Sequence, residues 1–256
     1  MIRAALVALG LLLALYAGVC ALFWVHQRSL LYFPAATRVD ARQTDFSLPR
    51  PDATLRGWAL QPQQPDPILY FGGNAEAVQF NRDDFRQWFP QRSVYLLAYR
   101  GYGASDGSAS QQALYADALA LYDAVRKRHP GQRISVIGRS LGSGMAMYVA
   151  AHRPVDRLVL VTPFDSMQAV GQAHFPWLPV RWLLRDRYPS SQWLPRYQGP
   201  LLVVRAGRDA VIPAISTQRL IESASAPPQL LELPRADHND VHTQPEYGPA
   251  MADFLR

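Results

Sequence analysis

The sequence predicts an α/β fold, in which a mostly parallel, doubly wound sheet carries a short helical cap and follows an N-terminal transmembrane helix. Three observations predict this fold. Short apolar strands such as 158–161 alternate with amphipathic helices such as 111–128, which is typical of a parallel sheet covered on both faces. A stretch rich in proline and tryptophan, 163–199, interrupts that alternation. An uncharged apolar run, 4–25, precedes all of it.

The N-terminal run is long enough to cross a membrane. As a helix, Ala4 to Val25 would measure about 33 Å, close to the ~30 Å thickness of the hydrocarbon layer. We therefore expect residues 1–28 to be a transmembrane anchor. A cleaved signal peptide is the alternative, but no Ala-x-Ala site occurs and the apolar run continues past Cys20.

The side of the membrane on which the remaining chain lies stays open at this point. Arginines follow the apolar run and only Arg3 precedes it, which favours a cytoplasmic location for the C-terminal part. Long domains, however, can translocate regardless of flanking charge. No pattern in the sequence indicates an oligomeric state.

The composition indicates a globular chain with one large domain, which we place at 29–256. Hydrophobic residues make up 49% and charged residues 18% of 256 residues, enough to build a core. The formal charge is +6, and the basic residues are scattered arginines with Lys127 as the only lysine. We find no nucleic-acid-binding motif and expect no nucleic-acid partner; attraction to anionic lipid headgroups is a better use of this charge. The single cysteine, Cys20, excludes an internal disulfide and a cysteine-based metal site.

The elements expected after the anchor follow the alternation. Residues 29–54 are expected to be a connector that leads into an edge strand. Strands are expected at 55–60, 68–71, 94–98, 134–137, 158–161, 201–204 and 230–233. Helices are expected at 78–89, 111–128, 141–152, 213–224 and 244–256. The stretch 163–199 is too long for a plain loop, so we expect it to form a helical cap over the carboxyl ends of the strands.

The turn after strand 134–137 carries a candidate nucleophile. Ser140 lies between Gly138 and Gly142, and the helix 141–152 follows at once. A Gly-x-Ser-x-Gly turn between a buried strand and a helix lifts the serine hydroxyl above the sheet, and the glycines leave room for the strained backbone. The same turn leaves the N–H of Leu141 at a helix N-terminus, free to stabilise an oxyanion.

A serine hydroxyl needs a general base and an orienting acid, and the later strands supply both. Asp209 follows the strand 201–204, and His238 follows the last strand. The order Ser140, Asp209, His238 is the one that this kind of fold requires for a catalytic triad. Asp165 is the rival acid and His242 the rival base.

Glycines also follow strand 68–71, where a second oxyanion donor is expected. In Gly72-Gly73-Asn74 the two glycines let the backbone approach a substrate, and we expect an N–H of Asn74 or Gly73 to point inward. We expect Gly72 to contact the substrate as well. In the cap, Trp177 and His174 are the candidate substrate-binding residues.

These blocks together resemble the α/β-hydrolase superfamily, and within it the membrane-anchored branch of ABHD-type serine hydrolases. The resemblance is carried by residues 70–76, 99–107, 138–142, 207–213 and 237–239, and it covers nearly the whole chain. It implies hydrolysis of an ester, thioester or amide. One position departs from the pattern, because relatives often have a histidine where Gly72 opens the oxyanion loop.

The sequence therefore predicts a membrane-anchored serine hydrolase that cleaves a carboxylic ester or thioester of a small-molecule or lipid-like acyl substrate. No metal and no organic cofactor is expected, because the triad and the oxyanion donors suffice for this chemistry. An acyltransferase or a peptidase on the same triad is an alternative. A non-catalytic membrane scaffold is a third, although folding alone does not require the three triad residues together.

Overall fold

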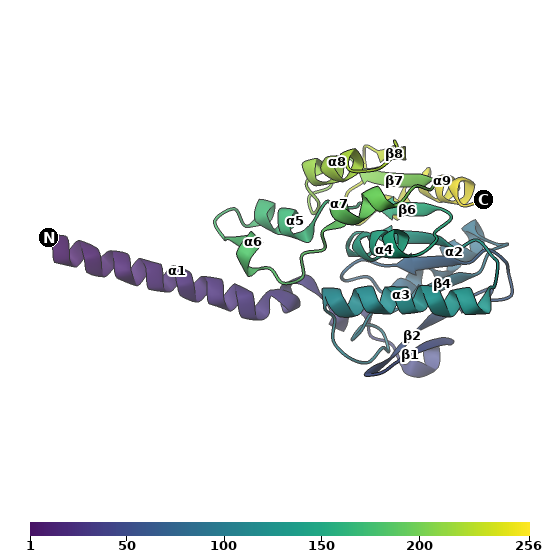
Figure 1. Ribbon diagram of the computed structural model, residues 1–256, viewed down its shortest axis with the longest axis horizontal. Helices are drawn as coiled ribbons and strands as arrows, with labels where there is room; N and C mark the ends of the chain where they lie inside the picture. The colour runs from purple at the N-terminus through teal and green to yellow at the C-terminus, as the bar shows by residue number, and fades with distance from the viewer.

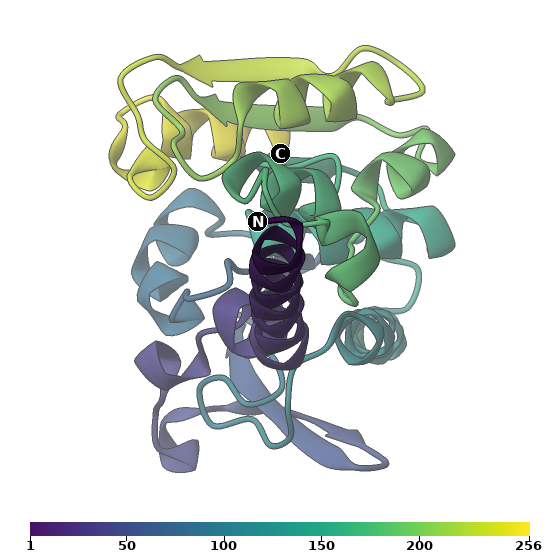
Figure 2. The same cartoon turned by 90° about the vertical axis from the view of Figure 1, so that its left-hand side faces the viewer.

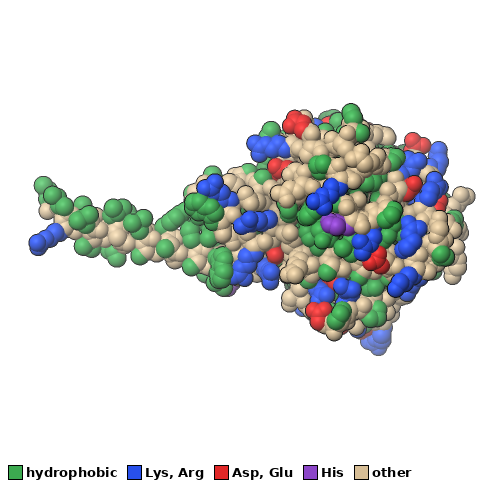
Figure 3. Space-filling model, in the orientation of Figure 1, with side chains coloured by type: hydrophobic (Ala, Val, Ile, Leu, Met, Phe, Trp, Pro, Cys, Tyr) green, Lys and Arg blue, Asp and Glu red, His purple; other side chains and the backbone are tan.

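The computed structural model describes all 256 residues, and its first element is a long helix that extends from the body of the protein. Helix α1 spans Ile2–Leu31 and is long and apolar enough to cross a membrane. Most of its residues are exposed, because the helix extends away from the body (Figure 1). Its C-terminal half contacts the body, from the hydrogen bond of Tyr16 to Trp177 down to the last turns, where Gln27 is buried. Hydrophobic side chains cover α1, and Lys and Arg side chains gather where it meets the body (Figure 3).

The body is built on one eight-stranded sheet with the order β1-β2-β4-β3-β5-β6-β7-β8. The strands are β1 (Phe46–Arg50), β2 (Ala53–Leu60), β3 (Ile68–Phe71), β4 (Val94–Leu97), β5 (Ser135–Arg139), β6 (Leu158–Val161), β7 (Leu201–Ala206) and β8 (Gln229–Leu233). Strand β2 pairs antiparallel with β1 and β4, and all other pairs are parallel. The chain moves outward in both directions from β3, so the carboxyl ends of β3 and β5 form the switch point at which open sheets bind ligands.

Helices cover both faces of this sheet (Figures 1 and 2). On one face lie α2 (Arg82–Trp88) and α9 (Tyr247–Phe254); on the other lie α3 (Gln111–Arg128), α4 (Leu141–His152) and α8 (Ala214–Glu222). The strands carry apolar residues on both sides because helices bury both faces of the sheet. In β3, Leu69 and Phe71 face the α3 and α4 side, whereas Ile68 and Tyr70 face the α2 and α9 side. The fold is therefore the predicted doubly wound α/β fold.

The stretch 163–199 forms helices of its own, as expected. They are α5 (Met167–His174), α6 (Val180–Leu183) and α7 (Ser190–Trp193), with a 3₁₀ turn at Leu194–Arg196. Helices α5 and α6 lie beside the C-terminal part of α1, at the end of the body from which α1 extends (Figure 1). The cap therefore contacts the N-terminal helix as well as the sheet.

The structure corrects three of the predicted elements. The connector 29–54 contains the last turn of α1, 3₁₀ turns at Pro34–Thr37 and Ala41–Gln43, and strand β1, which forms a hairpin with β2. The helix expected at 78–89 is a 3₁₀ turn, Val78–Asn81, followed by α2. The helix expected at 244–256 begins only at Tyr247, after a 3₁₀ turn at Val241–Thr243.

Candidate active site

The turn between β5 and α4 holds Ser140 in a strained backbone conformation. Its φ is 50° and its ψ is −119°, a region that non-glycine residues rarely adopt. Positions 138 and 142 must be glycine, because a side chain at either position would collide with nearby backbone atoms. A Cβ on Gly142 would lie 1.9 Å from the carbonyl oxygen of Phe71, and one on Gly138 would lie 2.5 Å from that of Gly142. The sharp turn presents the Ser140 hydroxyl at the carboxyl end of the sheet.

Ser140, His238 and Asp209 form a continuous chain of hydrogen bonds. Ser140 Oγ lies 2.8 Å from His238 Nε2, and His238 Nδ1 lies 2.8 Å from Asp209 Oδ2. With a proton on Nδ1, the imidazole donates to Asp209 and accepts from Ser140. This is the arrangement that general-base activation of a serine hydroxyl needs.

Asp209 is fixed by the backbone that follows it. Its Oδ1 accepts hydrogen bonds from the N–H groups of Val211, at 2.9 Å, and Ile212, at 2.7 Å. Oδ2 is thereby left to face His238. The two rival residues lie elsewhere: Asp165 accepts a hydrogen bond from the Ser216 hydroxyl at 2.6 Å, and His242 is exposed in the 3₁₀ turn Val241–Thr243.

Two backbone N–H groups beside Ser140 have no acceptor in the protein, those of Leu141 and Asn74. Leu141 is the first residue of α4, where N–H groups lack an intrahelical partner. Two hydrogen bonds fix Asn74 in its loop. The side-chain Nδ2 of Asn74 donates to the Leu31 carbonyl, and its carbonyl accepts from Tyr102 Oη at 2.6 Å. The N–H of Gly73, by contrast, donates to Glu76 at 2.7 Å, so Asn74 is the better placed of the two predicted donors.

A buried ion pair that sequence reasoning missed ties this loop to the serine turn. Glu76 Oε2 lies 3.0 Å from Nη1 of Arg139, the residue before Ser140. Arg139 Nη2 also donates to the carbonyl of Asn239, beside His238. One signal could have suggested the pair: a charged residue inside a buried strand-to-helix turn requires a buried partner.

Glu76 also accepts hydrogen bonds from the hydroxyl of Tyr70, at 2.5 Å, and from Asn81 Nδ2, at 2.7 Å. Burial alone would raise the pKa of the Glu76 carboxyl. The charge of Arg139 and the hydrogen bonds from Tyr70, Gly73 and Asn81 outweigh burial and lower its pKa below the ordinary value. Glu76 is therefore an ionised group that fixes the candidate oxyanion loop, residues 72–74.

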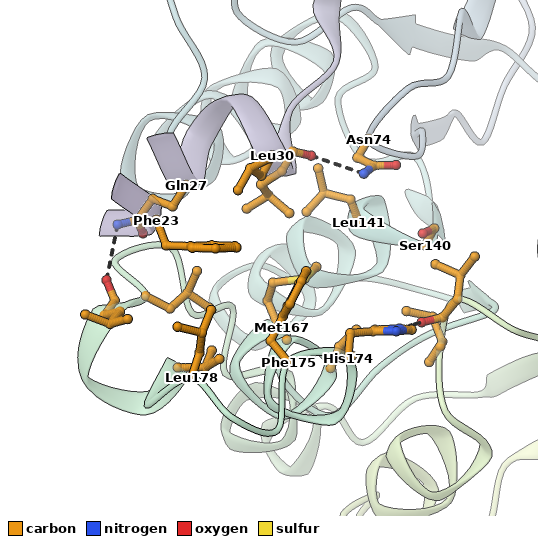
Figure 4. Close-up of a pocket in the computed structure, with 18 of the residues that line it drawn as sticks. Phe23, Gln27, Leu30, Asn74, Ser140, Leu141, Met167, His174, Phe175 and Leu178 are labelled. Atoms are coloured by element: carbon orange, nitrogen blue, oxygen red, sulfur yellow. Dashed lines mark hydrogen bonds between the residues drawn. The ribbon is translucent and has the colours of Figure 1, made fainter. Parts of the chain in front are cut away.

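Ser140 lies at one end of an apolar cavity of about 580 Å³, and 14 of its 19 lining residues are hydrophobic. None of the lining residues is an aspartate, glutamate, lysine or arginine. The cap supplies Met167, Val170, Gly171, His174, Phe175, Leu178, Val180, Leu183 and Leu184. Figure 4 shows Ser140 at one side of the cavity and Phe23, Gln27 and Leu30 of α1 at the other. Sequence reasoning did not place α1 at the cavity.

Of the three predicted substrate-binding residues, only His174 lines the cavity. His174 lines it, with its Nε2 2.7 Å from the carbonyl oxygen of Val211. Trp177 lies outside it, exposed, with its ring edge-on to Phe23 of α1. Gly72 also lies outside, where its carbonyl accepts from the hydroxyl of Tyr99 and a Cβ would collide with Val78.

Several known proteins are similar to this chain in sequence. A family model described as serine aminopeptidase, S33, matches residues 82–195. An uncharacterized protein of Mycobacterium tuberculosis H37Rv is 34% identical over 254 residues, which cover 93% of this chain and 89% of that protein. The lysophosphatidylserine lipase ABHD12 of Danio rerio is 26% identical over 191 residues, 64% of this chain and 50% of the lipase.

Solved structures give the same result for the fold. The Pyrococcus furiosus esterase Pf2001 superposes with a TM-score of 0.65 over 83% of this chain and 90% of the esterase, at 18% identity. The order of the sheet, the serine turn at its switch point and these similarities agree. The chain belongs to the α/β-hydrolase superfamily, and this membership supports hydrolase activity.

Proposed function

We propose that this protein is a membrane-anchored serine hydrolase that cleaves a carboxylic ester or thioester with a lipid-like acyl group. The observation that carries the proposal is the hydrogen-bonded chain from Asp209 through His238 to Ser140 at the end of an apolar cavity. The anchor is residues 1–28, and the catalytic domain is residues 29–256 with the cap inserted at 163–199.

The reaction proceeds through an acyl-enzyme. Ser140 Oγ attacks the carbonyl carbon while its proton moves to His238 Nε2, and Asp209 stabilises the resulting imidazolium. The N–H groups of Leu141 and Asn74 donate to the oxyanion. The imidazolium then protonates the departing alcohol or thiol. Water next gives a proton to His238 and attacks the acyl carbon. The bond between the acyl carbon and Ser140 Oγ then breaks, and His238 returns the proton to Oγ, which releases the acid and restores the Ser140 hydroxyl.

The lining of the cavity favours an acyl ester over a peptide. An aminopeptidase must hold a charged α-ammonium group, and that group needs an anionic or strongly polar partner when it leaves water. The lining contains no carboxylate. For an acyl chain, in contrast, each methylene that is buried against such a surface makes binding more favourable. The lipase activity named for the Danio rerio relative is consistent with this choice.

Labelling by a fluorophosphonate tests the site, because this reagent reacts with activated serines. We expect full-length protein in membranes to be labelled. Ser140→Ala should abolish labelling, and Asp209→Asn should slow ester hydrolysis by about 10⁴-fold, as loss of the orienting acid does in other triads. Asp165→Asn is the matched control, since Asp165 bonds to Ser216 instead of His238, and it should retain activity.

The same experiment can contradict the proposal. Folded wild-type protein that remains unlabelled would mean that no activated serine is present, and the scaffold interpretation would replace ours. Equal losses of hydrolytic activity in Asp165→Asn and Asp209→Asn would mean that Asp209 does not act by orienting His238.

A further inference from the structure

The last turns of α1 present one face to the cavity. Phe23, Gln27, Leu30 and Leu31 all line it, and their spacing of i, i+4, i+7 and i+8 is that of a single stripe on a helix. The stripe continues toward the N-terminus at Tyr16, whose hydroxyl donates to the Trp177 carbonyl of the cap at 2.7 Å. A helix that only anchored the protein would not need to contribute a wall to the cavity.

Specific bonds fix α1 in this position. The Gln27 side chain is buried, donates to the Leu183 carbonyl at 3.1 Å and accepts from the Arg185 N–H at 2.7 Å. At the next residue of α1, Arg28 Nε lies 3.0 Å from a carboxylate oxygen of buried Asp186. These contacts hold the α1 stripe against the cap segment that follows α6.

The wall formed by α1 reaches the protein surface. Leu30 is 54% exposed and Phe175 is 40% exposed, yet both line the cavity. Phe23 packs edge-on against Phe175, with ring centroids 5.5 Å apart. The row of apolar side chains that begins beside Ser140 therefore extends to Phe23 and Leu30 of α1 (Figure 4).

We propose that the α1 stripe forms part of an acyl-chain subsite, so that a chain esterified at Ser140 lies along Phe23 and Leu30 and extends toward the membrane. This proposal rests on the proposed function, since it assumes that Ser140 carries the acyl group. It assigns to the N-terminal helix a role in chain-length selectivity as well as anchoring.

Two fluorophosphonates, one with an ethyl chain and one with a dodecyl chain, test the subsite through the rate at which each labels Ser140. The full-length protein in phosphatidylcholine nanodiscs is used throughout. Each methylene buried in an apolar site is worth about fourfold in rate. We therefore expect the dodecyl compound to react at least about a hundredfold faster, once its partition into the nanodisc has been measured and corrected for.

Two substitutions in the wall should reduce this ratio. Phe23→Ala removes contacts with the chain and should lower the ratio by roughly tenfold. Leu30→Trp narrows the cavity at a half-exposed position, which the fold can accommodate, and should slow the dodecyl compound more than the ethyl one. Leu22→Ala is the control, because Leu22 neighbours Phe23 but is 59% exposed and does not line the cavity; it should leave the ratio unchanged.

Cross-linking locates the chain directly. A dodecyl fluorophosphonate with a terminal diazirine is attached to Ser140 and irradiated, and the protein is then digested with trypsin. We expect the label on the fragment 4–28, which contains Phe23 and Gln27. A label found only on fragments outside α1, or a dodecyl-to-ethyl ratio that Phe23→Ala and Leu30→Trp both leave unchanged, would overturn the subsite. Failure of both compounds to label wild type would instead refute the proposed function.

Discussion

Glu76 links the three parts of the candidate site that come from different segments of the chain. It accepts a hydrogen bond from the N–H of Gly73 in the candidate oxyanion loop and pairs with Arg139 in the serine turn. Arg139 in turn reaches the loop that carries His238. Because Arg139 is also largely buried, loss of the Glu76 charge would leave a guanidinium in a poorly solvated position without its counter-ion.

We therefore expect Glu76→Gln to lower the free energy of unfolding by about 3 kcal/mol at pH 7. The pKa of Glu76 is lower in the folded than in the unfolded chain, so its contribution is complete above the unfolded pKa of about 4.3 and is lost as the pH falls through the folded pKa. The stability curves of wild type and variant, measured by urea unfolding from pH 8 to pH 3, should converge at the acidic end.

Glu232→Gln is the matched control for this prediction. Its partner Arg205 lies at 3.1 Å, but the Glu232 side chain is 49% exposed, so the loss should stay below about 1 kcal/mol. Equal losses of unfolding free energy in the two variants would contradict the stabilising role of Glu76. Stability curves for Glu76→Gln and wild type that remain parallel down to pH 3 would contradict it as well.

Sequence reasoning identified the candidate triad but missed the Glu76–Arg139 pair, and the reason is physical. Strand order alone defines where each candidate triad residue lies. The nucleophile lies between two glycines, the acid follows one strand end, and the histidine follows the last strand. Glu76 lies in the loop after β3, and Arg139 is the last residue of β5, 63 positions further along the chain. Only the parallel pairing of β3 with β5 brings them together.

At the scale of elements, four helices and strands with a one-sided or fully buried pattern were predicted with their observed bounds, namely β3, β6, α3 and α4. Strand β1 was missed because Pro49 and the polar residues around it weaken its pattern, and its stability comes from the hairpin with β2. The contact of α1 with the cap could not be predicted, since the helix is apolar on every side and no periodicity distinguishes the stripe that faces the cavity.

The attachment of α1 to the cap predicts a local effect of Gln27→Ala. The substitution leaves the Leu183 carbonyl and the Arg185 N–H without their partner, at a cost of about 1–2 kcal/mol. Opening of the segment after α6 should become about tenfold more frequent, and trypsin cleavage at Arg185 and Arg187 should accelerate by that factor in full-length protein.

Ser29→Ala is the control for Gln27→Ala, because the Ser29 hydroxyl only donates to the His26 carbonyl within α1 and is exposed. It should leave the cleavage rate unchanged. If Gln27→Ala also left the rate unchanged, the bonds between α1 and the cap would not hold this segment.

At the scale of the whole molecule, α1 and the cap define which side of the protein would lie against a bilayer. The helix has 30 residues and measures about 45 Å, longer than the ~30 Å hydrocarbon layer. In the membrane-anchored arrangement that we propose, its last turns would fall at the lipid–water interface, level with the cap. The cap exposes Trp177 and Trp182 there, with the guanidinium of Arg181 stacked 4.5 Å from the Trp182 ring. Aromatic and arginine side chains are typical of that interface.

This placement predicts which tryptophans approach lipid. In vesicles that contain phosphatidylcholine brominated near the ester group, the full-length protein should lose fluorescence, because bromine quenches indole on close approach. Trp177→Phe and Trp182→Phe should each reduce the quenchable fraction. Trp88→Phe is the control, since Trp88 lies in α2 and packs edge-on against Tyr247 of α9, at the far end of the body from α1 (Figure 1). If removing Trp177 and Trp182 left the quenchable fraction unchanged, the cap would lie away from the lipid, and an acyl chain would have to reach Ser140 through water.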